Sequence, residues 1–152
     1  MCIRDSYSKI LNIPKINYQI EENCINFESI CSGQKIVDVS LITEESKYLI
    51  QNVRDRLGAT KVTTVICLPS GSSKQLLTSQ ISKYMDFQPI IAFTKIDECQ
   101  LFARELCVLA NKHVKMGLIT GSKTILGSVA LSGPDVLARH LESYITDGLS
   151  DE

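Results

Sequence analysis

Short runs of apolar, β-branched residues alternate along this chain with longer stretches in which apolar residues recur every three or four positions. Runs of the first kind are typical of buried strands, and stretches of the second kind are typical of helices with one buried face. Repeated strand and helix units stack onto a mainly parallel sheet, because each parallel connection needs a crossover. The alternation therefore predicts an α/β domain with strands at residues 16–20, 35–41, 62–68, 90–94 and 115–120.

Apolar stripes mark the predicted helices between these strands. Gly58 follows the last apolar turn of the first helix, Ser72 or Ser73 can cap the second, and a last helix is expected over residues 135–145. The stripes indicate buried faces rather than cofactor boxes, and they comprise Leu49, Val53 and Leu57, then Leu77, Ile81 and Met85, then Phe102, Leu106 and Leu109.

Composition excludes several classes of protein. At 152 residues and 44% hydrophobic residues the chain can bury one core, and its net charge of -1 with no basic stripe argues against a direct nucleic-acid partner. The six cysteines show no C-x-x-C spacing and do not cluster with the two histidines, which favours reduced thiols over a zinc or redox site. No apolar run of about 18 residues is present, so we expect a cytoplasmic protein without a transmembrane segment.

The most informative segment is an apolar strand that leads directly into Thr94-Lys95-Ile96-Asp97. A carboxylate such as that of Asp97 can accept two hydrogen bonds from the N1 and N2 donors of guanine, while the aliphatic stem of Lys95 lies along the rings. Adenine offers no such pair of donors on that edge, so a carboxylate there selects guanine. Taken alone, Lys-x-Asp at a strand end is equally compatible with a solvated turn.

The strand, helix and strand over residues 62–98 resemble GTPases of the signal-recognition-particle type, and most of all their flagellar branch. A second stretch, Tyr7-Ser8-Lys9-Ile10-Leu11-Asn12-Ile13-Pro14, looks like the family's Tyr-Ala-x-x-Leu-x-Val-Pro, so the resemblance covers roughly residues 7–145. It implies a three-layer, P-loop NTPase-like G domain that lacks its amino-terminal phosphate-loop half.

The resemblance also implies a domain organisation and a set of base contacts. We expect residues 1–6 to be a spurious or disordered leader, residues 7–146 a partial G domain, and residues 147–152 an acidic tail. Thr94, Lys95 and Asp97 would bind guanine. Gly121 and Ser122 stand where the family has its second base loop, although an extra stretch over residues 123–132 leaves that alignment open.

Two further segments compare less well with nucleotide-binding patterns. Where the family has Asp-Thr-Ala-Gly-Arg, only Asp38 is present, a leucine replaces the glycine, and the arginine is missing. Asp38 is therefore either a residue linked to magnesium or an ordinary polar strand end. The stretch over 117–124 superficially suggests a phosphate loop, but only three residues separate its glycines and a serine precedes its lysine, so the spacing is wrong.

The resemblance implies that a complete parent protein binds GTP with Mg²⁺ and acts in flagellar assembly or placement, or in protein targeting to the membrane. Such a parent would form a homodimer or dock on a protein partner, with peripheral association at the inner membrane. The altered segment after Asp38 favours an alternative, a degenerate G-like domain that does not hydrolyse GTP and acts as a protein-interaction module. We expect this chain alone to be inactive, and its spacing supports no catalytic or metal-ligating group.

Overall fold

A computed structural model describes residues 36–40, 43–99, 101, 103–121, 129–133, 135–139 and 142 of the chain. The chain divides into two compact units, Met1–Ser40 and Leu41–Glu152. In the first unit only residues 36–40 are described, and they form neither strand nor helix. The strand predicted over 35–41 is therefore wrong for these residues, because a β-branched run becomes a strand only when its backbone finds a pairing partner. The strand predicted over 16–20 lies outside the described residues.

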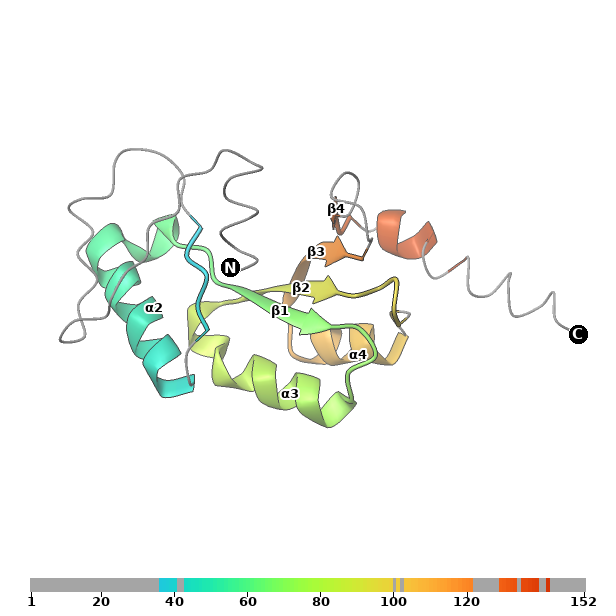
Figure 1. Ribbon diagram of the computed structural model, residues 1–152, viewed down its shortest axis with the longest axis horizontal. Helices are drawn as coiled ribbons and strands as arrows, with labels where there is room; N and C mark the ends of the chain where they lie inside the picture. The colour runs from blue at the N-terminus through green and yellow to red at the C-terminus, as the bar shows by residue number, and fades with distance from the viewer. Residues whose placement is uncertain are drawn as a thin grey trace, which may run out of the picture. The chain divides into compact units, whose positions relative to one another are not determined.

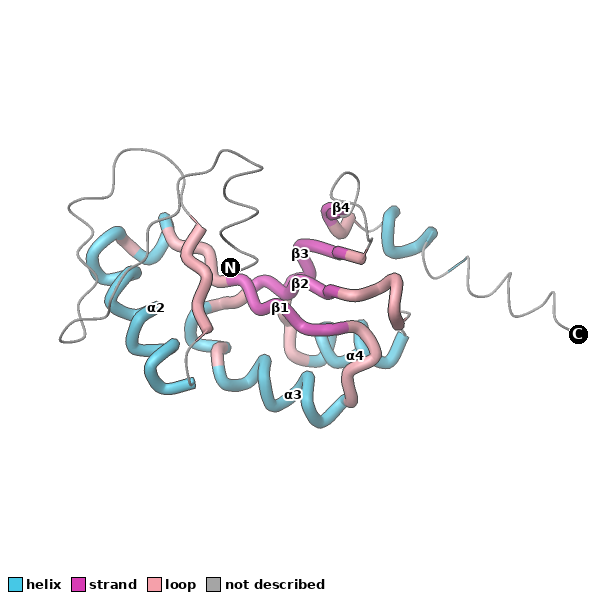
Figure 2. Tube along the Cα trace, viewed as in Figure 1, coloured by secondary structure: helices cyan, strands magenta, loops and turns pink. Residues whose placement is uncertain are grey.

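The described part of the second unit contains a sheet of four strands (Figures 1 and 2). The strands are β1 (Val65–Pro69), β2 (Ile90–Thr94), β3 (Lys115–Thr120) and β4 (Val129–Leu131), and they lie in the order β1-β2-β3-β4. The first three run parallel, whereas β4 is antiparallel to β3. The predicted α/β class with a mainly parallel sheet is thus confirmed.

Within the second unit the three predicted strands are found, with one shifted boundary and one further strand. Strands were expected at 90–94 and 115–120, where β2 and β3 lie, but β1 begins three residues later than the predicted start at residue 62. The sequence does not predict strand β4, which falls within the extra stretch over residues 123–132. It has only three residues, all exposed, so it carries no alternation of buried and exposed positions for a pattern to detect.

Two helices cover one face of this sheet (Figure 1). Helix α3 (Lys74–Lys83) connects β1 to β2, and helix α4 (Ala103–Asn111) connects β2 to β3. The Ser73 hydroxyl caps α3 by accepting a hydrogen bond from the Leu76 amide at 3.2 Å, as predicted. The three-layer arrangement stays a prediction. Side chains from both helices and from the sheet form one buried cluster, which comprises Leu68, Leu77, Ile81, Ile91, Phe93, Leu101, Val108 and Leu109.

Helix α2 (Thr43–Leu57) precedes the sheet and is followed by the short 3-10 helix η1 (Ala59–Lys61). The helix ends at Gly58, as predicted, because this residue has a φ of 90° and its amide donates to the Arg54 carbonyl at 2.8 Å. The Arg54 guanidinium donates to the Phe87 carbonyl at 2.8 Å and lies over the Phe87 ring. Leu57 is predicted to be buried, but it is the last residue of the helix and is 44% exposed.

The other two stripes also need correction. Helix α3 ends before Met85, which is 36% exposed in the 3-10 helix η2 (Met85–Phe87), and Phe87 is buried in its place. In the third stripe Leu109 is buried as predicted, Leu106 is half-buried, and Phe102 lies outside the described residues. The other buried positions in and just before α4 are Leu101, Glu105 and Val108.

Residues 135–139 and 142 are helical, which agrees with the predicted last helix over the part that is described. No helix among the described residues is both long enough and apolar enough to span a membrane.

Candidate functional site

The carboxyl ends of β1, β2 and β3 lie at one edge of the sheet, because these strands are parallel. Open α/β sheets bind ligands at this edge, where side chains and loops extend beyond the strands. The described loops there are residues 70–73 after β1, residues 95–99 after β2, and Gly121 after β3. We call residues 95–99 the β2 turn.

The Lys95 carbonyl organises the β2 turn. It accepts hydrogen bonds from the amides of Glu98 and Cys99, both at 3.0 Å. Lys95 itself has a φ of 60°, a left-handed conformation that reverses the chain as it leaves the strand. Asp97 lies in the middle of this turn and is exposed. Its carboxylate makes no hydrogen bond or ion pair with any residue that the structure describes, so both of its oxygens can accept from a ligand.

The Lys95 side chain pairs with Glu98 across the same turn. The distance from Lys95 Nζ to Glu98 Oε2 is 3.1 Å, and the two side chains are 59% and 62% exposed. An exposed ion pair of this kind contributes only about 0 to 1 kcal/mol. The lysine stem can therefore move onto a ligand ring at little cost.

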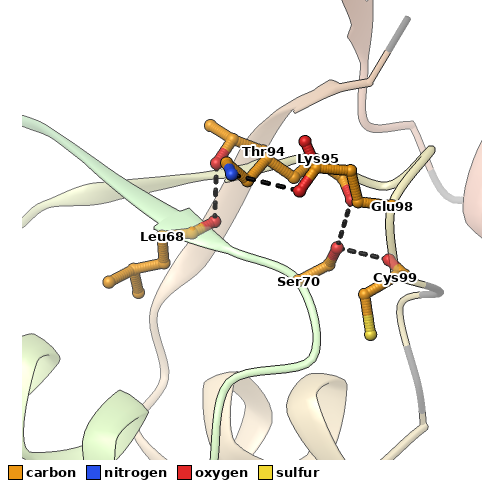
Figure 3. Close-up of polar contacts among 6 residues, drawn as sticks. All are labelled: Leu68, Ser70, Thr94, Lys95, Glu98 and Cys99. Atoms are coloured by element: carbon orange, nitrogen blue, oxygen red, sulfur yellow. Dashed lines mark hydrogen bonds and ion pairs between the residues drawn. The ribbon is translucent and has the colours of Figure 1, made fainter.

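Thr94 joins β2 to β1. Its hydroxyl donates to the Leu68 carbonyl at 3.4 Å (Figure 3). Its carbonyl accepts from the Ser70 amide at 2.8 Å. The hydroxyl of this predicted site residue is thus directed at the neighbouring strand. Thr94 holds the start of the β2 turn in place, whereas the exposed Asp97 carboxylate has no partner among the described residues and the exposed Lys95 side chain is paired with Glu98.

Gly121 packs directly against the β2 turn. A Cβ atom at this position would lie 2.6 Å from the Ile96 nitrogen and 2.8 Å from the Asp97 nitrogen, closer than real Cβ atoms approach. The Ile96 amide also donates to the Thr120 carbonyl at 3.3 Å. The structure therefore brings predicted site residues Asp97 and Gly121 together, and glycine is needed for that approach. Ser122 lies outside the described residues.

Two polar residues on the other side of the turn were missed by the sequence interpretation. Ser70 is 7% exposed, and its hydroxyl contacts the carbonyls of Lys95, at 3.0 Å, and Cys99 (Figure 3). Glu105 is fully buried on α4 and accepts a hydrogen bond from the Gly71 amide at 2.8 Å. Neither residue has a local signal in the sequence, because a serine after a strand and a glutamate in a helix are by default solvated.

Asp38 belongs to the first unit. Since residues 36–40 form no strand, the prediction that Asp38 lies at the carboxyl end of a strand is wrong.

Within the described residues no group of three or more His, Cys, Asp or Glu side chains could hold a metal ion. Cys67, Cys99 and Cys107 are free thiols.

Comparison with known proteins gives no relative for this chain: no family model, no curated protein and no solved structure matches it. The candidate site therefore depends on its geometry and on the resemblance of its segments.

Proposed function

We propose that this chain is part of a guanine-nucleotide-binding domain of the signal-recognition-particle GTPase type, in which the β2 turn reads the base. One observation supports this proposal above the others. The Asp97 carboxylate is exposed, has no partner among the described residues, and lies at the carboxyl edge of a parallel sheet.

Each nearby group has a defined part in this proposal. The two Asp97 oxygens accept hydrogen bonds from N1 and N2 of guanine, and a charged acceptor makes these bonds stronger than neutral ones. The Lys95 stem lies along the ring system after leaving Glu98. Gly121 allows the chain after β3 to pass close to the base, and the resemblance assigns Ser122 to the same loop.

Phosphate binding has less support among the described residues. The amides of Ser70 and Gly71 begin the loop between β1 and α3, but both are already occupied, by the Thr94 carbonyl and by Glu105 respectively. They cannot also bind a phosphate in this arrangement. On the resemblance, a phosphate loop would hold the phosphates and their Mg²⁺, and Asp38 would be linked to that Mg²⁺.

Binding without turnover is the expected behaviour of this chain. The segment after Asp38 has Leu41 where a glycine would approach the γ-phosphate, and it lacks the arginine that could stabilise charge on the transferred group. We therefore expect phosphate release from GTP no faster than the uncatalysed background in a coupled phosphate assay. Magnesium-dependent release that Asp97→Ala abolishes would contradict this expectation.

The cellular role in the proposal comes from the resemblance alone: flagellar assembly or placement, or protein targeting, with a protein partner or second copy at the membrane surface. The same altered segment favours a second candidate, a non-hydrolysing G-like module that binds a protein partner. The relative binding of GTP and ATP distinguishes the two candidates. A guanine-nucleotide-binding domain should prefer GTP, whereas a protein-interaction module needs no such preference.

The test is a titration of the ¹⁵N-labelled chain with GTP, XTP and ATP, followed by amide chemical shifts. Wild type should show shifts in the β2 turn with GTP and not with ATP. Asp97→Asn removes an acceptor pair worth roughly 1.5 to 3 kcal/mol per bond, so the GTP-induced shifts of this chain should be lost, and in a complete parent protein with a phosphate loop GTP binding should weaken by about two orders of magnitude or more. XTP, which carries a carbonyl in place of the exocyclic amine, should bind this variant better than GTP.

Asp86→Asn is the matched control, because Asp86 is also an exposed aspartate but lies in η2, before the amino end of β2. It should leave the ranking of the three nucleotides unchanged. If Asp97→Asn also leaves that ranking unchanged, the β2 turn is only a solvated strand end.

A further inference from the structure

We propose that Ser70 and Glu105 are positioning residues for base recognition: they clamp the β2 turn from the β1 side without touching the ligand. This inference rests on the proposed function for its consequence, but the clamp itself can be measured without nucleotide.

The Ser70 hydroxyl joins the two ends of the β2 turn. It contacts the carbonyl of Lys95, the first residue of the turn, and the carbonyl of Cys99, the last (Figure 3). A hydroxyl has one proton to donate, so that proton is shared between two acceptors. Ser70 is buried, and water therefore does not readily replace it. Asp97 lies between the two clamped ends.

Glu105 holds the loop that carries Ser70. Its Oε1 accepts from the Gly71 amide at 2.8 Å, and the residue has no exposed surface. A polar group at such a position is costly unless it is hydrogen-bonded, and the Gly71 amide supplies one such bond. Gly71 has a φ of 77°, and a Cβ there would overlap the Cys99 side chain. The buried hydrogen bond from the Gly71 amide to Glu105 on α4 thus holds this loop next to the β2 turn.

The clamp matters for binding because an unrestrained turn must be ordered when the base arrives. Fixing backbone residues costs free energy that is subtracted from affinity, and a turn already held in its bound geometry avoids this cost. Losing one hydrogen bond of ordinary strength in the clamp should weaken GTP binding about three- to tenfold.

The experiment compares Ser70→Ala with Ser79→Ala, a control that removes an exposed serine hydroxyl from α3. The first readout is hydrogen exchange of the Glu98 and Cys99 amides in the nucleotide-free chain, since both donate to the Lys95 carbonyl. Ser70→Ala should speed their exchange about tenfold, whereas Ser79→Ala should not. The second readout is the GTP titration, in which only Ser70→Ala should lose affinity.

A pair of variants at Glu105 gives an independent check. Glu105→Gln keeps an oxygen that can accept from Gly71 and should preserve slow exchange in the β2 turn, whereas Glu105→Ala should reproduce the Ser70→Ala pattern. Unchanged exchange in Ser70→Ala would overturn the clamp whatever the nucleotide data show. Faster exchange in Ser70→Ala, combined with a wild-type chain that does not prefer GTP to ATP, would instead overturn the proposed function and with it the positioning role.

Discussion

Replacing Gly121 with alanine tests the contact that brings the loop after β3 against the β2 turn. The new methyl group would meet the Ile96 side chain, which can rotate, but also two backbone nitrogens, Ile96 at 2.6 Å and Asp97 at 2.8 Å, which cannot. The β2 turn would have to move, and the 3.3 Å hydrogen bond from the Ile96 amide to Thr120 would lengthen. Overpacking of this kind costs about 1 to 3 kcal/mol.

The assay is equilibrium urea unfolding of Gly121→Ala beside Gly133→Ala, where an added Cβ meets nothing within 4 Å. The control should be unchanged or slightly stabilised, since alanine restricts the unfolded chain. The Ile96 and Asp97 amide signals should shift in Gly121→Ala only. Equal stability of the two variants, with these amides in their wild-type positions, would refute the close approach and remove Gly121 from the candidate site.

Three further outcomes are expected. Leu77→Ala, at a fully buried position, should lower the free energy of unfolding by about 2 to 5 kcal/mol in the same assay. Gly71→Ala should cost more than Gly58→Ala, because both glycines have positive φ but only Gly71 also meets Cys99, and similar losses would show that backbone strain alone matters. Glu98→Gln should change stability by less than about 1 kcal/mol, because its ion pair is exposed; a larger, salt-insensitive loss would contradict this.

The parts of the fold that could be predicted are those in which local pattern and tertiary environment agree. Strand β2 consists of four apolar residues followed by Thr94, and three of its residues are buried. Its local sequence is therefore sufficient to predict where the strand begins and ends. Residues 36–40 include the β-branched Ile36, Val37 and Val39 but form no strand, because pairing depends on a neighbour that the local sequence does not encode. For the same reason β4, with three exposed residues, left no pattern to detect.

In the candidate site, too, some residues could be predicted from the sequence and others could not. Asp97 and Gly121 could be selected from the sequence, because each follows a predicted strand at a position where the resemblance implies a contact with the base. Ser70 and Glu105 could not, since their importance comes from burial and from partners 25 to 34 residues away in the chain. A glutamate in a helix is by default a solvated residue, and only the corrected stripe of α4 places it inside the core.

The position of β2 between β1 and β3 explains why the β2 turn is braced on both sides. On the β3 side, Gly121 has no side chain, so its backbone can lie close to the backbone of Ile96 and Asp97. On the β1 side, the Ser70 hydroxyl contacts both ends of the turn. Neither residue has a charge, and the Ser70 hydroxyl is already engaged within the chain. If Asp97 reads guanine, its affinity therefore depends on neighbours that hold its backbone still, and substitutions at those neighbours should weaken binding even though the carboxylate remains.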